Sequence, residues 1–228
     1  VNGGSNNAGS IQTIFTRGAS GGRTLVLLDG IPVNDPSFIN NDLDLNLFAT
    51  SSIERIEICR GAQSTLYGSD AIAGVINIIT TSKDISKPLQ INVSTLLGSF
   101  GTVKNNVQIA GKKNKWTFSA RLAQTNSKGF SASIDTTGKN KFDADSYHGT
   151  ALHGQLNYAA TEHFSIKAFS MYNKYKAGVD AGIFKDDRDF TITNSSLLVG
   201  TGFVYKKNNW QITGTYQHNT LDRHFLND

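Results

Sequence analysis

The histidines, the single cysteine and the aspartates are the residues from which this chain could build a metal centre or a nucleophilic site. The five histidines show no zinc-site spacing; they are His148, His153, His163, His218 and His224. Cys59 stands alone, which excludes an internal disulfide framework and a multi-cysteine metal site. No Ser–His–Asp order has supporting local motifs, and no paired carboxylates stand out on adjacent strand faces. We therefore expect no enzyme and no covalent chemistry.

Aspartates gather in two polar stretches of the second half of the chain. The segment that begins at Asp143 is not an EF-hand, because its sixth position is His148 and its twelfth is Gly154, where Gly and Glu are required. Asp180 and the run from Asp186 to Asp189 are also explained as solvated loop charges. The residue types alone leave two interpretations open, a metal site of another kind and solvated loop charge.

Composition excludes several classes of protein. The 228 residues are 38% hydrophobic, 10% aromatic and only 18% charged, which is too apolar for a disordered chain. The heptads of a coiled coil are absent. The net charge of +4 is spread along the chain with no basic stripe, so we expect no nucleic-acid partner. The sequence contains no run of about 18 apolar residues, so no transmembrane helix is predicted. Strands of a membrane barrel leave a much weaker signal and are not excluded by this absence.

Residues 1–82 predict a small mixed α+β domain. Thr24–Leu28 and Gly74–Ile79 are continuous apolar runs, as in strands buried on both faces. Residues 53–58 alternate and predict a strand with one wet face. Asp29-Gly30 predicts a turn, and the only plausible helical stretch is Gln63–Ala73.

Residues 83–228 follow a different rule, a period-two alternation of apolar and polar residues. The seven predicted strands, each about ten residues long, span 89–97, 103–110, 116–124, 151–158, 164–173, 197–205 and 210–218. The fifth and sixth are less clean, because apolar residues interrupt their polar face: Phe169, Met171, Leu198 and Val204.

The connections between these strands alternate between short and long. Short turns at 111–115, 159–163 and 206–209 alternate with long polar loops at 125–150 and 174–196. Aromatic residues flank the short turns, as at the interface of a membrane barrel; they are Trp116, Tyr158, Phe164, Tyr205 and Trp210. A soluble antiparallel sandwich is the alternative. Because barrels close with an even number of strands, we expect this chain to be a fragment whose missing strands follow Asp228.

The first domain carries motifs of a known family. Thr16-Arg17-Gly18 and the run from Thr24 to Pro36, followed by residues 53–61 and 66–80, resemble the plug domain of TonB-dependent outer-membrane receptors. Two positions depart from the family pattern: Ala62 stands where Pro is usual, and Cys59 where an aliphatic residue is usual. The resemblance implies a small α+β plug domain (residues 1–82) followed by antiparallel transmembrane β-barrel strands (83–228) from a barrel of roughly 22 strands.

Within the family, the chain is most similar to cobalamin receptors. This resemblance implies ligand contact through two plug loops, Ala19-Ser20-Gly21-Gly22-Arg23 and Leu66-Tyr67-Gly68-Ser69. It also implies a calcium site built from loop aspartates; the matching positions are Asp143, Asp145, Asp180, Asp187 and Asp189.

The function that the resemblance implies is active import across the bacterial outer membrane. The expected partners are a cobalamin or iron-chelate ligand, the membrane lipid and the TonB energy-coupling protein, whose contact segment normally precedes the plug and is missing here. A ferric siderophore receptor is the alternative, because it would share every plug motif. A passive porin or adhesin would lack these motifs.

Overall fold

The computed structural model describes residues 9, 12, 14–20, 22–35, 43–48, 53–80, 85–136, 138, 142–182 and 184–227. The chain divides into two compact units. The first comprises residues 1–4, 11–46 and 52–83, and the second comprises residues 84–228 together with residues 5–10 and 47–51. The second unit thus takes in two short segments that the sequence analysis assigned to the first domain. Among the described residues, no helix is long and apolar enough to cross a membrane.

The first unit is built on a four-stranded sheet with the order β2-β1-β4-β3. Its strands are β1 (Thr24–Leu28), β2 (Ile31–Pro32), β3 (Arg55–Arg60) and β4 (Gly74–Ile79). The short helix α1 (Ser64–Tyr67) lies between β3 and β4, and the short helix η1 (Leu45–Leu47) ends on a residue of the second unit. Strand β1 runs parallel to β4, while β2 and β3 run antiparallel to their neighbours. The predicted mixed α+β organisation is confirmed, but the helix covers only a third of the predicted stretch because Gly68 ends it at a φ of 92°.

The core of this sheet lies around β1. All five residues of β1 are buried, as the continuous apolar run predicts for a strand between two neighbours. Leu25 and Leu27 pack with Val75 of β4 and with Ala71. Full burial of a leucine or valine side chain contributes about 1.5–3 kcal/mol, so these few residues supply most of the stability of a thin core.

The end of the sheet beyond β1 is closed by Asp29. Asp29 and Gly30 have φ values of 50° and 83° and form the tight turn into β2. The Asp29 carboxylate accepts hydrogen bonds from the Thr80 backbone N–H at 2.9 Å and from the Thr80 hydroxyl at 2.6 Å. The turn therefore holds the residue that follows β4 in place.

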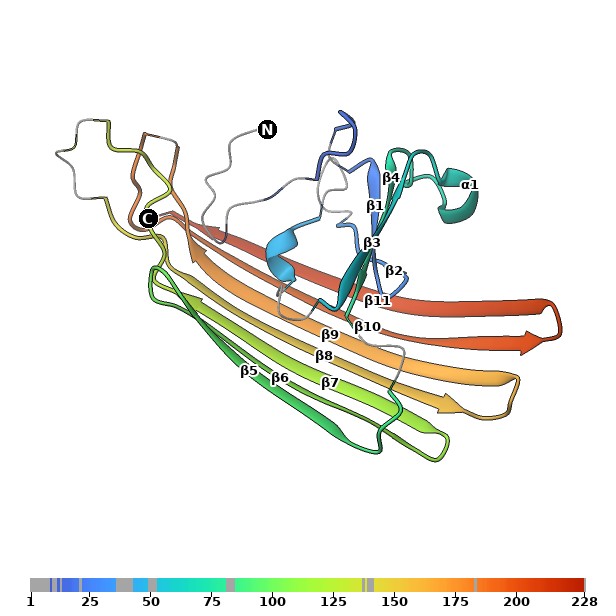
Figure 1. The fold of residues 1–228 in the computed structure, drawn as a ribbon. Coiled ribbons are helices and arrows are strands. Elements are labelled where there is room, and N and C mark those ends of the chain that lie inside the picture. The colour runs from blue at the N-terminus through green and yellow to red at the C-terminus, as the bar shows by residue number, and fades with distance from the viewer. Residues whose placement is uncertain are drawn as a thin grey trace. The chain divides into compact units, whose positions relative to one another are not determined.

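The second unit is a seven-stranded antiparallel sheet in which neighbours in the chain are neighbours in the sheet, from β5 to β11 (Figure 1). The strands are β5 (Gln90–Gly98), β6 (Thr102–Lys113), β7 (Trp116–Ser127), β8 (Tyr147–Ala159), β9 (Phe164–Gly178), β10 (Thr191–Lys207) and β11 (Trp210–Leu226). The seven predicted strands are confirmed. Most are longer than predicted, because the strands continue into polar residues where the alternation fades.

The connections of this sheet differ in length between its two ends. At one end the turns are short, and Asn114 and Asn208 take the left-handed conformation there with φ values of 53° and 52°. At the other end lie loops 128–146 and 179–190, which are shorter than predicted. The β5–β6 connection at this second end, residues 99–101, is also short, which departs from the strict alternation of lengths.

One face of the sheet is apolar along its whole width. Because paired residues share a face, the register aligns Val107, Leu122, Leu152, Tyr172 and Leu197 in one row across five strands. These side chains are exposed by 37–50%. We call this side, which carries the odd residues of β5, β6 and β10 and the even residues of β7, β8, β9 and β11, the apolar face.

The opposite side, the polar face, carries amides, hydroxyls and charged groups. Met171 and Leu198 lie opposite each other on it, only 9% and 2% exposed, so the predicted interruption of the polar pattern is confirmed. At the short-turn end, aromatic residues next to the turns lie on the apolar face; the ring centroids of Trp116 and Tyr158, for example, are 4.5 Å apart. This placement confirms the predicted row of aromatic residues.

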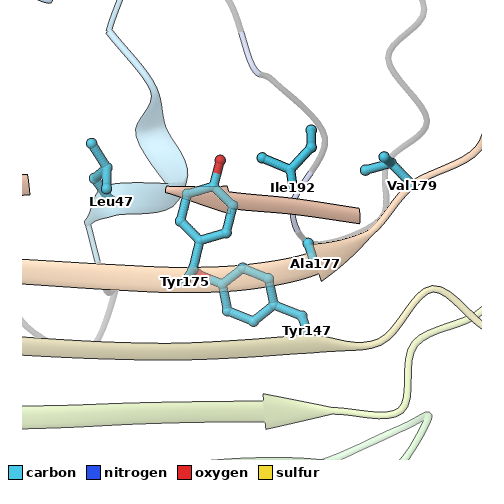
Figure 2. Close-up of a cluster of buried hydrophobic side chains, with 6 residues drawn as sticks. All are labelled: Leu47, Tyr147, Tyr175, Ala177, Val179 and Ile192. Carbon is cyan, nitrogen blue, oxygen red and sulfur yellow. The ribbon is translucent and has the colours of Figure 1, made fainter. Parts of the chain in front are cut away.

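At the long-loop end, the second unit contains its own hydrophobic cluster (Figure 2). Its members are Leu47, Tyr147, Tyr175, Ala177, Val179 and Ile192. The rings of Tyr147 and Tyr175 are stacked, with centroids 5.6 Å apart and an angle of 20° between their planes. The cluster lies where β8 begins and β9 ends; loop 128–146 ends at the first of these points, and loop 179–190 begins at the second.

Candidate functional site

Two loops of the first unit meet at one end of the four-stranded sheet, and each contains a segment predicted to contact ligand, 19–23 in the first and 66–69 in the second. Residues 19–23 lead into β1, and residues 61–73 join β3 to β4. Thr24 pairs with Gly74 in the parallel register, and Arg60 pairs with the same glycine in the antiparallel register. The Ala73 backbone N–H donates to the Arg23 carbonyl oxygen at 2.8 Å. The structure therefore brings together the two loops that carry the predicted segments, through the contact of Arg23 with Ala73, which lies beyond Ser69.

The segment before β1 is a compact turn. Ala19 pairs with Thr16 in an isolated bridge, and its N–H donates to the Thr16 carbonyl at 3.0 Å. The Arg23 guanidinium donates to the Ser20 hydroxyl at 3.0 Å, and both side chains are exposed. Gly22 takes a φ of 76°, whereas Gly21 lies outside the described residues. The turn thus presents a hydroxyl and a cation.

The second segment presents apolar side chains on a short helix. Leu66 and Tyr67 are 78% and 50% exposed. The helix is tied down behind them, because the Gln63 N–H donates to the Ala71 carbonyl at 2.9 Å. The Ser69 hydroxyl is engaged with Asp70 at 3.3 Å.

Two residues that the sequence analysis did not select lie at the same end: Arg60, which ends β3, and Ile72, which is 50% exposed. The signal for Arg60 was its place directly before the glycine turn at Gly61. This end of the four-stranded sheet therefore carries cations, hydroxyls and apolar side chains, which suit recognition of a ligand by shape and polar contacts.

A second candidate site lies in the loops of the second unit. Carboxylate oxygens of Asp143, from loop 128–146, and of Asp180 and Asp186, from loop 179–190, all lie within 4.8 Å of one another. Asp145 adjoins them and is only 3% exposed. Three of the five predicted calcium ligands, Asp143, Asp145 and Asp180, are thus brought together.

The remaining two predicted ligands lie apart from this group. Asp187 contributes its backbone N–H to Asp180 at 3.0 Å, while its own carboxylate accepts from the Asn227 amide at 3.4 Å. Asp189 is exposed. Asp186, which the sequence analysis did not select, takes their place. Four consecutive residues of this loop include three aspartates, and only the turn geometry decides which one faces the cluster.

Backbone donors hold the carboxylates in place. Asp180 accepts from the Ser133 N–H at 2.6 Å, and Asp145 accepts from the Ala132 N–H at 2.7 Å. The Asp143 N–H donates to Asp186 at 3.2 Å. Because the bonds to Asp180 and Asp186 run between the two loops, the cluster also joins one loop to the other.

The carboxylates raise one another's proton affinity. Burial raises the pKa of Asp145 to about 6, against a lowering by the Ala132 hydrogen bond, and the neighbouring Asp180 and Asp143 raise it further. Burial also raises the pKa of Asp143, followed by the closeness of Asp186 and Asp180. Arg188 lies 3.7 Å from Asp186 but is itself exposed.

The donor set fits a hard divalent cation. Calcium takes six to eight oxygen ligands, and carboxylates from two loops supply several of them. One oxygen of Asp143, Oδ1, is buried and has no hydrogen-bond partner, as expected for an atom that faces a metal ion. Crowded carboxylates with raised pKa values are stabilised when a cation replaces their protons.

Comparisons with known proteins agree with the geometry of both units. Residues 1–75 match the family of the TonB-dependent Receptor Plug Domain. Three solved structures illustrate the likeness of the whole chain. The ferric enterobactin receptor PfeA of Pseudomonas aeruginosa is 15% identical with a TM-score of 0.68, over 96% of this chain and 37% of PfeA.

The ferric-catecholate import receptor Fiu of E. coli K12 is 12% identical with a TM-score of 0.73, over 95% of this chain and 34% of Fiu. The siderophore receptor PiuA of Acinetobacter baumannii is 12% identical with a TM-score of 0.72, over 96% of this chain and 32% of PiuA. The chain therefore spans about a third of the length of each of these structures. The similarity to cobalamin receptors that the sequence suggested receives no support from these comparisons. The chain carries a TonB-dependent receptor plug domain, followed by antiparallel strands with the fold of a TonB-dependent receptor barrel.

Proposed function

We propose that this chain is the plug and adjoining barrel wall of an outer-membrane receptor that imports a ferric siderophore. The observation that carries the proposal is the meeting of two loops, 19–23 and 61–73, at one end of a plug sheet whose fold is shared with siderophore receptors. The cations Arg23 and Arg60 suit an anionic iron chelate, and the exposed Leu66 and Tyr67 suit its apolar or aromatic parts.

The proposed mechanism is import driven by energy coupling from the periplasm. Ligand binds to the plug loops from outside, and the TonB protein pulls on the plug from the periplasm. The complete barrel would be closed and have roughly 22 strands, because an open edge such as that of β11 is costly in lipid. Import in this mechanism makes and breaks no covalent bond.

Uptake measurements test the ligand directly. Cells that depend on this protein are given radiolabelled iron bound to a catecholate, to a hydroxamate or to a citrate-type chelator, and, separately, labelled cobalamin. We expect uptake of at least one iron chelate that stops when TonB is removed. Uptake of cobalamin alone would overturn the siderophore proposal and restore the ligand that the sequence first suggested.

A second proposal concerns the acidic cluster. We propose that Asp143, Asp145, Asp180 and Asp186 hold a calcium ion, which would join loops 128–146 and 179–190 and order them for ligand capture. The buried, unpartnered Asp143 Oδ1 and the two raised pKa values support this proposal. Calorimetry with calcium tests this proposal. If ligand affinity is unchanged when calcium is chelated, in a protein that still takes up ligand, these aspartates are only solvated loop charges.

A further inference from the structure

Two short segments, one before β1 and one after β2 in the sequence, belong to the second unit and not to the plug sheet. Residues 5–10 and 47–51 group with the second unit, whereas residues 11–46, which contain β1 and β2, group with the first. The structure describes Gly9, Leu47 and Phe48 of these segments. We call these three residues the anchor. The chain therefore leaves the second unit after the first segment and returns to it at the second.

Leu47 is buried in the hydrophobic cluster at the long-loop end of the second unit (Figure 2). Its side chain is only 5% exposed, and the rings of Tyr147 and Tyr175 belong to the same cluster. Phe48 is partly buried and packs against this cluster from its edge. Buried apolar surface thus holds the segment that follows β2.

Gly9 reaches the same cluster through its main chain. Gly9 is buried and has a φ of 102°. A Cβ at this position would overlap the Cβ of Ala177 and would lie 3.7 Å from a ring carbon of Tyr147. The main chain therefore comes so close to Ala177 that only a glycine fits. Both ends of residues 11–46 are thus fastened to one cluster.

The cluster is an apolar patch on the polar face. The register places its strand residues on that face, and each is at most 8% exposed; they are Tyr147, Tyr175, Ala177 and Ile192. The next residue of β9 on the same face is an amide, Asn173. Parts of a protein that move relative to each other usually meet through polar surface, whereas permanent contacts are more apolar. The patch therefore indicates a contact that stays closed.

The two fastened ends turn residues 11–46 into a closed loop. In the proposed function, TonB pulls on the chain that precedes the plug, so the force reaches Gly9 before it reaches β1. Strand β1 is itself paired with β2 and β4. The anchor then bears the load that would otherwise separate these strands.

We propose that the anchor stays closed throughout import, so that residues 11–46, with β1 and β2, remain in the barrel while the ligand passes. This proposal rests on the proposed function, which supplies the pull. It adds a division of the plug into a part that is fixed to the wall and a part that is free to move. Import by removal of the whole plug is incompatible with it.

A cross-link tests the proposal directly. The full-length protein with Cys59→Ser carries Phe48→Cys and Leu221→Cys, two positions at the edge of the cluster, and a flexible bis-maleimide joins the two thiols. Cells that contain this protein are given the panel of radiolabelled iron chelates. Because a contact that never opens cannot limit the rate, we expect uptake within about twofold of that of each single-cysteine variant treated in the same way.

Thiol labelling detects any opening of the anchor without a cross-link. Leu47→Cys places a thiol at a position that is 5% exposed, and the control Phe184→Cys places one in loop 179–190 at 68% exposure, both with Cys59→Ser. A maleimide dye is added to energised cells during uptake. We expect Leu47→Cys to react at least about tenfold more slowly than the control, at the same rate with and without TonB.

Two results would overturn the anchor. The first is loss of uptake in the cross-linked protein when both single-cysteine variants still import. The second is labelling of Leu47→Cys that accelerates only when TonB is present. If the single-cysteine variants take up none of the chelates, the proposed function fails instead, and the labelling of Leu47→Cys in energised cells still decides whether the anchor opens.

Discussion

In the plug sheet the apolar side chains of the central strand β1 lie inside, whereas in the barrel sheet a whole apolar face is exposed. Strand β1 buries all five of its residues, and its leucines pack on β4. The row from Val107 to Leu197 instead stays 37–50% exposed, while the polar face of the same strands buries Asn173 and Asn194. The contrast teaches that one chain can follow two burial rules, and the proposed function assigns one of them to water and the other to lipid.

The largest expected effect tests the plug side of this contrast. Leu28→Ala removes a side chain that is only 1% exposed, and we expect the plug to lose about 2–5 kcal/mol of stability because a cavity replaces packed atoms. Hydrogen exchange of the β1 and β4 amides measures the loss. The control Ile56→Ala, on β3 at 51% exposure, should cost less than about 1 kcal/mol. Equal losses would mean that the thin core does not hold the plug together.

The next effect tests the barrel side. Leu122→Lys places a charge on the apolar face of β7, and we expect a cost of about 2–4 kcal/mol in a bilayer. Ser119→Lys, on the polar face of the same strand, should cost far less, as the native Arg121 on that face indicates. Denaturant unfolding in lipid vesicles measures both variants. If the two lysines cost the same, the apolar face does not contact lipid.

The third effect tests the place where the barrel unit buries charge. Asp186→Asn removes one carboxylate of the cluster, and we expect calcium affinity to fall by at least tenfold. Asp189→Asn removes the same charge from an exposed position of the same loop and should leave the affinity nearly unchanged. Calorimetry separates the two variants, and an equal loss in both would indicate diffuse attraction instead of coordination.

The same cluster predicts how pH acts. The pKa of Asp145, raised to about 6 in the folded chain, means that the folded state holds this proton more tightly than the unfolded state. Without calcium, the resulting stability is fully present below about pH 4 and is lost as the pH rises through 6. The calcium ion proposed for this cluster would bind only the charged form, so its affinity should fall as the pH drops below about 6.

Much of this architecture could be predicted from the sequence because it depends on local patterns. The run Thr24–Leu28 and the alternation that begins at Trp116 each identify a strand without reference to any other segment. The outer parts of the barrel strands could not be predicted in this way. Lys174 and Lys176, for example, lie in a polar stretch that by itself predicts a loop. They belong to strand β9 because they pair with residues of β8 and β10 beyond the apolar part of the sheet.

The sites divide in the same way. The sequence identified both plug loops by their motifs, but it could not place them together, because their meeting depends on the parallel pairing of β1 with β4. The aspartates of the two loops were selected through the family resemblance, since their residue types alone also fit solvated loop charge. The choice of Asp186 over Asp187 and Asp189 depends on the bond from the Asp187 N–H to Asp180, which turns the Asp187 main chain toward the cluster. The need for glycine at position 129 also could not be predicted from the sequence, because it comes from the main-chain carbonyl of Asp145, which a Cβ there would overlap.

The smallest effect on stability accompanies the sharpest test of function. Tyr67→Ala removes a ring that is 50% exposed, so the stability of the plug should change by no more than about 0.5 kcal/mol. If the ring contacts the iron chelate, the affinity for it should fall roughly tenfold, which is about 1.4 kcal/mol. Tyr216→Ala, 70% exposed on the apolar face of β11, removes the same ring where lipid and not ligand would cover it, and ligand affinity should stay unchanged. Titration of the iron chelate against both variants measures the difference. An exposed apolar side chain would thus mark a ligand site in the plug and a lipid contact in the barrel, and equal affinities in the two variants would remove that distinction.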